Sequence, residues 1–284
     1  MTFPPTALHD RLLGHLQEVG RDRDPYFASQ GHFYVQHYIS QQLAQWGTVQ
    51  FHSFWVHGRC HYNLVLDLPG QRSDAAPILI GAHYDAVMGS PGADDNATGI
   101  AVLLELARAF AIAPARSPVR LVAFDLEESG LVGSVAYVRD LVQQQQPLKL
   151  MLSLEMLGYC DRRPLSQRYP PGLRWFYPHQ GDFIALIGNG SLIPVMMRLR
   201  RAMRQGGPVP CEWLPVVNQG RIVADTRRSD HAPFWDAGYP AILVTDTADL
   251  RNPHYHRASD RLDTLDLDFL TAVCQGLIHG LRSL

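Results

Sequence analysis

The segment APILIGAHYD, residues 76–85, decides the fold class that the sequence indicates. It is a continuous apolar run, which is typical of a strand buried on both faces of a sheet. The next segment, ATGIAVLLELARAFA at 97–111, has the apolar spacing of a helix, and PVRLVAFDLEE at 118–128 is again a strand. Buried strands that alternate with helices predict an α/β fold with a mostly parallel, mixed central sheet and helices on both faces.

The alternation continues on both sides of this unit, and the chain of 284 residues is predicted to form one domain spanning 1–284. Further helices are expected at 5–19, 28–46, 129–145, 191–205 and 266–283, with those at 5–46 packed on the rest of the domain. Further strands are expected at 49–58, 61–70, 148–157, 182–190 and 239–247. Segments 159–181 and 206–228 are expected to be long loops, either the walls of a pocket or variable surface decoration.

Composition and charge bear on partners and location. Hydrophobic residues make up 46% of the chain, and the formal net charge is −2 with no basic run, so neither nucleic acid nor a membrane is an expected partner. No apolar stretch approaches the ~18–20 residues that cross a bilayer, and no signal peptide is evident, so a cytoplasmic protein is expected. The sequence does not indicate an oligomeric state. The scattered cysteines are predicted to be mostly reduced, with one or two disulfides left open: Cys60, Cys160, Cys211 and Cys274.

Acidic and histidine side chains follow several predicted strands at their carboxyl ends, where open α/β sheets bind ligands. These residues are His83, Asp85, Asp94, Asp95, Glu127, Glu128, Glu155, His254 and His256. Each has an ordinary explanation by itself, such as a polar cap, a surface turn or a favourable charge at a helix start. However, Glu155 interrupts an apolar strand, and two adjacent glutamates follow another, where unpaired carboxylates are costly. Together these residues predict a metal site at one edge of the sheet.

The ligand types favour zinc, with manganese or cobalt as substitutes, because nitrogen and oxygen donors are present without thiolates. Two nearby ions that share one carboxylate would use this number of ligands and would activate a water for attack on a carbonyl. His83 and Asp85 lie on the same side of an extended segment, so one could bind metal while the other holds the free imidazole nitrogen. One of the two adjacent glutamates would remain free to take a proton.

With these residues the sequence resembles the co-catalytic zinc aminopeptidase family, which includes glutamate carboxypeptidases and, more distantly, glutaminyl cyclases. The resemblance covers roughly residues 75–270 and implies the zinc exopeptidase fold, which is phosphorylase/hydrolase-like. The segments that carry it are, in order, GAHYDAV, PGADDNATGIAVLLELAR, FDLEESGLVGS, LEMLGY, RSDHAPFWDAGYPAI and NPHYHRASDRLDTLD.

The resemblance implies five zinc ligands. His83 and Glu155 would hold the first zinc, Glu128 and His256 would hold the second, and Asp95 would bridge both. The family pattern takes the histidine that follows the tyrosine in NPHYH, which selects His256 over its neighbour two residues earlier. Asp94 would not bind metal and would face either solvent or residues behind the ligands.

Other implied roles concern residues that do not bind zinc. Glu127 would be the general base, and Asp85 would orient His83. The peptide bond between Asp95 and Asn96 is expected in the cis form. The segment at 229–231 (Ser-Asp-His) also matches the family, without a role that the sequence assigns.

The activity that the resemblance implies is removal of the N-terminal residue from a peptide with a free amino terminus. Glu127 would take a proton from the attacking water and return it to the leaving amine, and burial beside a second acid would raise its pKa. One alternative is a glutaminyl cyclase that needs a single zinc, and another is a non-catalytic member of the family. The residue specificity depends on segments 159–181 and 206–228, which could provide either apolar contacts or arginines for an acidic substrate.

Overall fold

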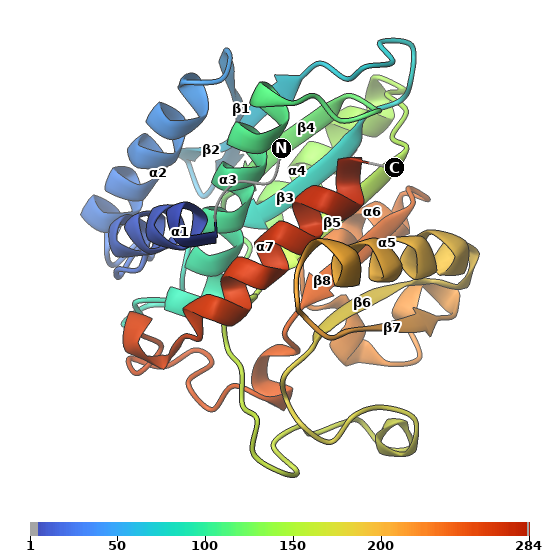
Figure 1. Cartoon of the computed structure of the whole chain (residues 1–284). Coiled ribbons are helices and arrows are strands. Elements are labelled where there is room, and N and C mark those ends of the chain that lie inside the picture. The colour runs from blue at the N-terminus through green and yellow to red at the C-terminus, as the bar shows by residue number, and fades with distance from the viewer. Residues whose placement is uncertain (1–4, 283) are drawn as a thin grey trace.

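The computed structural model describes residues 5–282 and 284, and one mixed sheet forms its centre (Figure 1). The strands are β1 (Val49–Val56), β2 (Arg59–Leu68), β3 (Ile78–His83), β4 (Val119–Phe124), β5 (Leu150–Glu155), β6 (Ile184–Asn189), β7 (Cys211–Val216) and β8 (Ala241–Thr245). Their spatial order is β1-β2-β4-β3-β5-β8-β6-β7. Strands β4, β3, β5 and β8 run parallel, as do β6 and β7, and the remaining pairs are antiparallel. The predicted mostly parallel, mixed sheet is therefore confirmed.

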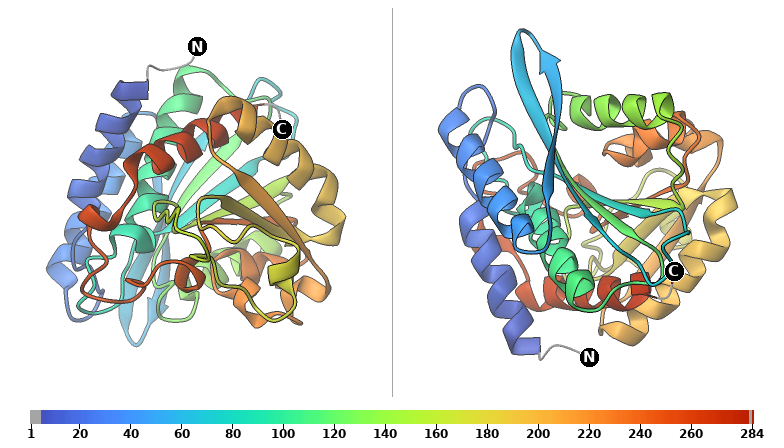
Figure 2. Two further views of the ribbon diagram at one scale, coloured as in Figure 1. Left: turned by 60° about the horizontal axis from the view of Figure 1, so that its bottom comes forward. Right: turned by 90° about the horizontal axis from the view of Figure 1, so that it is seen from above.

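Helices cover both faces of this sheet, as the view from above shows (Figure 2). The helices are α1 (Pro5–Val19), α2 (Ser29–Ala44), α3 (Gly99–Ile112), α4 (Val132–Gln143), α5 (Ile193–Gly206), α6 (His231–Asp236) and α7 (Leu267–Arg282). Helices α3, α5 and α7 lie on one face, with α1 packed against α3 and α7. Helices α4 and α6 lie on the other face. None of the helices in the described part of the chain has the length and apolar character required to span a membrane.

The central strands are apolar without interruption because both of their faces are buried. Ile80 and Leu152 face the core beneath α3 and α7, whereas Leu79 and Met151 face the core beneath α4 and α6. Each such side chain contributes about 1.5–3 kcal/mol when it is removed from water. The continuous apolar pattern of 76–85 is thus explained by two cores, one on each side of the sheet.

The structure corrects one of the two predicted loops. Segment 206–228 contains strand β7, which pairs with β6 at the end of the sheet. A proline within this strand, Pro215, is compatible with an edge position but weakens the sequence signal for a strand. Segment 159–181 is a loop as expected, with one short helical turn at Leu173–Trp175. All four cysteines have free thiols, so the disulfides that the sequence left open are absent.

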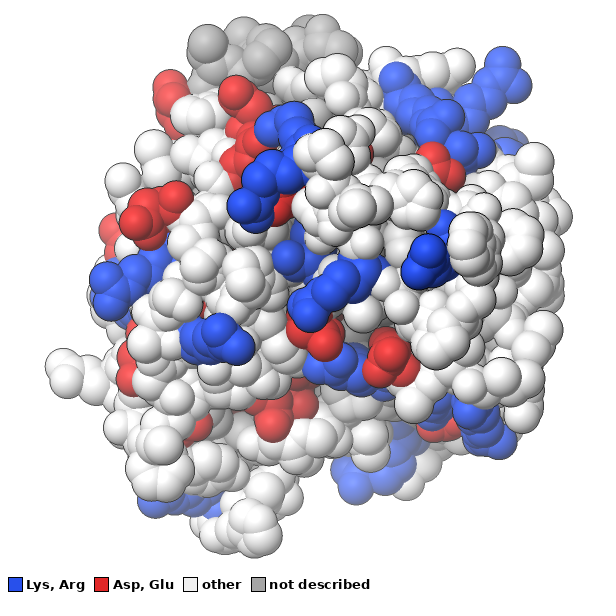
Figure 3. All heavy atoms as spheres, turned by 90° about the horizontal axis from the view of Figure 1, so that it is seen from below, with Lys and Arg blue, Asp and Glu red and all other residues white. Residues whose placement is uncertain are grey.

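Charge is mixed on the side of the molecule toward which loop 159–181 projects. Lys and Arg side chains are interspersed there with Asp and Glu, and they do not gather into a single field (Figure 3). This distribution matches the nearly balanced totals of 25 basic and 27 acidic residues.

Candidate metal centre and active site

Three parallel neighbouring strands deliver the polar side chains of the site. His83 is the last residue of β3, Glu155 is the last residue of β5, and Glu127 and Glu128 follow β4 by a few residues. Because β4, β3 and β5 are adjacent and parallel, their carboxyl ends lie side by side. The strand order thus brings residues from distant parts of the sequence to one edge, as expected for an open α/β sheet.

Together with Asp95 and His256, these side chains form two groups that share one carboxylate. A third possible group joins His83 with Glu127 and Glu128. In the first group, His83 Nε2 lies 3.2 Å from Asp95 Oδ1 and 3.4 Å from Glu155 Oε1. In the second, His256 Nε2 lies 3.2 Å from Asp95 Oδ2 and 3.1 Å from Glu128 Oε2. Within each group the potential ligand atoms all lie within 4.8 Å of one another. Asp95 thus offers a different oxygen to each group, which is the geometry of a bridging ligand.

The chemistry of this donor set fits divalent zinc. Each group offers one imidazole nitrogen and carboxylate oxygens, which are common zinc ligands. Among the described residues, Glu128 Oε1 is buried without a hydrogen-bond partner. Burial, followed by the charge of Asp95, raises the pKa of Glu128 to about 7, although His256 opposes the shift. A bound cation would compensate these crowded carboxylates, so the residues present can hold the metal that the sequence predicts.

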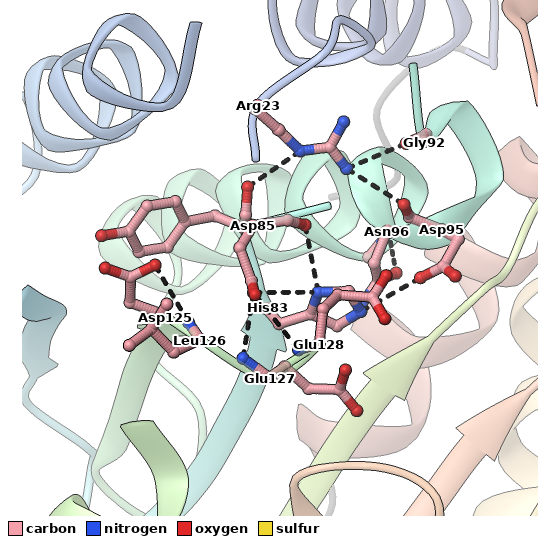
Figure 4. A network of polar contacts seen from close by, with 12 residues as sticks. Arg23, His83, Asp85, Gly92, Asp95, Asn96, Asp125, Leu126, Glu127 and Glu128 are labelled. Atoms are coloured by element: carbon pink, nitrogen blue, oxygen red, sulfur yellow. Dashed lines mark hydrogen bonds and ion pairs between the residues drawn. The ribbon is translucent and has the colours of Figure 1, made fainter. Parts of the chain in front are cut away.

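Asp85 supports both halves of the site from behind. Its Oδ1 accepts the amide of Glu127 and its Oδ2 accepts the amide of Glu128, both at 3.1 Å (Figure 4). The same carboxylate lies 3.4 Å from His83 Nδ1, the ring nitrogen that faces away from the other ligands. Asp85 is therefore placed to orient the imidazole, as the resemblance implies, and it also fixes the backbone that carries the two glutamates.

Glu127 has the environment of a proton acceptor. Burial raises the pKa of its carboxyl well above the ordinary value, and the negative charges of Glu155 and Asp230 add to this effect. His83 opposes the shift without cancelling it. A carboxyl whose pKa is raised holds a proton more readily, which suits a group that must accept one and later donate it.

The loop that carries Asp95 is tied to the end of β5 by its neighbour. The Asp95–Asn96 peptide bond is cis, as the sequence resemblance implied. The side-chain amide of Asn96 donates to the carbonyl of Leu154 at 2.7 Å and accepts the amide of Met156 at 3.1 Å. Asp260 accepts the amides of residues 94 and 95 with its two oxygens. The bridging carboxylate thus belongs to a loop that is hydrogen-bonded on two sides.

Asp94 lies outside the groups of predicted metal ligands, and it is fully buried. Its Oδ1 accepts the amide of Gly158 at 2.9 Å, and its Oδ2 accepts the side-chain amide of Asn252 at 2.7 Å. Of the two positions expected for Asp94, exposure to solvent is therefore wrong, and a place behind the ligands is what the structure has.

A buried arginine, which the sequence gave no reason to single out, also holds this loop. Arg23 lies between α1 and α2 and is fully buried. Its guanidinium donates to the carbonyl oxygens of Tyr84 at 2.8 Å, Pro91 at 2.6 Å, Gly92 at 2.9 Å and Asp95 at 3.2 Å. Figure 4 shows the contacts to Gly92 and Asp95. Contacts to main-chain oxygens leave no motif in the sequence, so no signal could have identified it.

The Ser-Asp-His segment contacts a predicted ligand through its serine. The hydroxyl of Ser229 donates to Glu155 Oε2 at 2.8 Å and also pairs with the hydroxyl of Ser153 at 2.9 Å. His254, the alternative to His256, lies with its Nδ1 3.0 Å from Ser259 Oγ, and it is in neither ligand group. The structure therefore places His256 beside Asp95 and Glu128, whereas His254 lies outside the ligand groups.

An apolar pocket adjoins the ligands, with Glu155 and Tyr255 among its lining residues. Segment 159–181 contributes Tyr169, Leu173 and Tyr177 to its wall, and segment 206–228 contributes Trp213, Leu214 and Val223. Of the charged groups in the lining, Arg228 forms an ion pair with Asp249 at 2.9 Å. Segments 159–181 and 206–228, whose roles the sequence left open, thus both contribute side chains to one cavity beside the site.

Comparison with known proteins identifies the family. The family model described as Peptidase family M28 matches residues 63–280, which is most of the chain. The chain belongs to peptidase family M28. This match confirms the resemblance seen in the sequence and the predicted class of enzyme, a peptidase.

Several known proteins are similar over much of the chain. The Escherichia coli protein YfbL is 36% identical over 237 residues, which cover 78% of this chain and 71% of that protein. The chain spans 38–58% of the length of the leucine aminopeptidases and the Bacillus subtilis aminopeptidase YwaD that it also matches.

Solved structures support the fold of this M28 chain. The Legionella pneumophila LapA aminopeptidase superimposes with a TM-score of 0.73 at 20% identity, covering 98% of this chain and 74% of that one. A Bacteroides thetaiotaomicron glutaminyl cyclase superimposes with a TM-score of 0.68 at 16% identity, covering 99% and 98%. At these identities the likeness concerns the fold, which both chemistries share.

Proposed function

We propose that this M28 chain is a two-zinc aminopeptidase that releases apolar residues from the amino terminus of peptides. The observation that carries the proposal is the pair of ligand groups joined by Asp95, with Glu127 beside them. His83 and Glu155 would hold one zinc, and Glu128 and His256 the other. The relatives named as aminopeptidases support cleavage at the amino-terminal end of the substrate.

The ions, when bound, would polarise the scissile carbonyl and lower the pKa of a water. Glu127 takes the proton of the attacking water, because its raised pKa favours the protonated form. It then returns the proton to the nitrogen of the leaving amine. Asp85 keeps Glu127 in reach during both transfers, since it holds the backbone amide of that residue.

The apolar pocket is proposed to receive the side chain of the N-terminal residue. Its wall is rich in aromatic and aliphatic groups, and its two most enclosed carboxylates are already engaged. Glu155 faces the ligand group, and Glu212 is paired with Arg200 and Arg204 at 3.0 Å each. A large uncharged side chain such as leucine or phenylalanine therefore suits this pocket better than lysine or glutamate.

The proposal is tested by measuring both the zinc content of the purified protein and its activity on aminoacyl-nitroanilides. The expected result is two zinc ions per chain and faster release from leucyl than from lysyl or glutamyl substrates. Activity toward N-acetylated leucyl substrates should be absent, because the free amine is required. Equal cleavage of blocked and free substrates would contradict an aminopeptidase.

A glutaminyl cyclase is the second candidate, because a protein of that activity has the same fold. The complete second ligand group, Asp95 with Glu128 and His256, favours the hydrolase, since a cyclase needs one zinc. A single bound zinc and conversion of glutaminyl peptides to pyroglutamyl products would select the cyclase.

A further inference from the structure

The segment that carries the proposed base has all of its backbone amides held by side chains. The four consecutive amides of residues 125–128 donate, in order, to Asn63 at 3.0 Å, to the carboxylate of Asp125 at 2.9 Å, and twice to Asp85 at 3.1 Å. No helix or strand fixes these residues, because they lie between β4 and α4. Their conformation depends instead on where these acceptors are placed.

Asp125 is itself held by two histidines from elsewhere in the fold. His32 Nε2, on α2, lies 2.7 Å from Oδ1 of Asp125, and His61 Nδ1, on β2, lies 3.1 Å from Oδ2. All three side chains are buried, and the imidazole of His32 also stacks on the ring of Tyr84 at 5.1 Å. Two N–H donors on opposite oxygens define both the position and the rotation of the carboxylate.

The electrostatics agree with this geometry. Burial alone would raise the pKa of Asp125, but the hydrogen bonds and charges of His32 and His61 lower it below the ordinary value. Burial would lower the pKa of His32, yet Asp125 and then Asp85 raise it overall. Asp125 is therefore an ionised acceptor, which binds donors more strongly than a neutral acid does.

Neither histidine belongs to the ligand groups found among the described residues, and each directs a ring nitrogen at Asp125. We propose that His32 and His61 are positioning residues, which fix Asp125 and so hold Glu127 at the distance that proton transfer requires. This inference rests on the proposed function, in which Glu127 is the general base. It adds that residues on α2 and β2 contribute to the rate without touching substrate.

Isosteric amides test the inference, because glutamine can place a nitrogen where Nε2 of histidine lies and asparagine where Nδ1 lies. His32→Gln and His61→Asn keep the donor, whereas His32→Asn and His61→Gln misplace it. Each of the two variants with a misplaced donor should lower kcat by about tenfold to a hundredfold, with KM and zinc content close to wild type. Small displacements of a catalytic group are costly in this way. The two variants that keep the donor, His32→Gln and His61→Asn, should avoid most of this loss. His37→Asn, at an exposed histidine on the same helix, is the control and should leave kcat unchanged.

The outcomes separate this inference from the function on which it rests. If the misplaced variants retain wild-type kcat, or if matched and misplaced amides lose kcat equally at equal folded fraction by thermal unfolding, positioning by these histidines is refuted. If wild-type protein releases no N-terminal residues, or if Glu127→Gln remains active, the proposed function itself fails.

Discussion

The backbone amide of Glu127 donates to the carboxylate of Asp85 at 3.1 Å. The second oxygen of the same carboxylate accepts the next amide, that of Glu128, and Oδ1 also lies 3.4 Å from His83 Nδ1. One buried acid therefore contacts a predicted zinc ligand and the backbone of both glutamates. Displacement of any of these groups is transmitted to the others through a single side chain.

Replacement of the two adjacent glutamates should separate proton transfer from metal binding. Glu127→Gln keeps the size of the side chain but removes the proton acceptor, so kcat should fall by at least about a hundredfold while two zinc ions remain bound. Glu128→Gln, its matched control, should instead reduce zinc content. Metal analysis and steady-state kinetics on the same preparations check both, and loss of zinc in Glu127→Gln would contradict the assignment.

Two adjacent aspartates should respond differently to loss of charge. Asp95→Asn should abolish tight binding of zinc, because both ligand groups share this carboxylate. Asp94→Asn should bind zinc but unfold more readily, since one buried oxygen that accepts a hydrogen bond is replaced by a donor. Calorimetric titration of chelator-treated protein with zinc, together with thermal unfolding, distinguishes them. Tight zinc binding by Asp95→Asn would show that the bridge is assigned wrongly.

Narrowing the apolar pocket should change which residue is released. Ala185 lies on β6 and lines the pocket, so Ala185→Leu adds volume where the substrate side chain is proposed to lie. The expected kcat/KM for a leucyl substrate falls by about tenfold or more, a typical effect of a few methylene groups in a pocket. An alanyl substrate serves as the internal control and should be affected much less. An equal loss for both would place the substrate side chain elsewhere.

Stability should fall in mild acid because one histidine is buried in its neutral form. Burial lowers the pKa of His231 to about 4, although its hydrogen bond to the carbonyl of Thr226 partly opposes this. The unfolded chain takes up this proton near pH 6.5 and the folded chain only near pH 4, so stability is lost as the pH falls between these values. At pH 5 the loss from this group is on the order of 2 kcal/mol.

Urea unfolding of wild-type protein and His231→Gln at pH 7 and pH 5 measures that loss. Glutamine can keep the hydrogen bond to Thr226 but does not titrate, so the variant should lose less stability on acidification. Identical pH dependence in the two proteins would assign the acid sensitivity to other groups.

The sheet was predictable because its strands obey a simple physical rule. Strands buried on both faces are apolar throughout, and this made β3, β4 and β5 recognisable. Strand β7 was not found because it lies at the edge, where half-exposed residues and Pro215 replace the apolar run. The sequence signal was therefore strongest at the centre of the sheet, where the ligands are delivered.

The candidate ligands could be selected because charged side chains in apolar surroundings need a partner. The supporting residues were not predictable in the same way. Asp260 and Asn96 act on backbone groups, and the quoted motifs include both without revealing those contacts. The pairing of His32 with Asp125 joins residues 93 positions apart, and it depends on how α2 packs beside the sheet.

Arg23 has a consequence for how this chain can be divided. The family match covers residues 63–280 and includes every proposed zinc ligand, but Arg23 lies outside it. A fragment cut at the limits of the match would retain the whole ligand set while losing the cation that binds the carbonyl oxygens of residues 84, 91, 92 and 95. A fragment of this peptidase that keeps these contacts therefore extends at least to Arg23, well before the family match begins at residue 63.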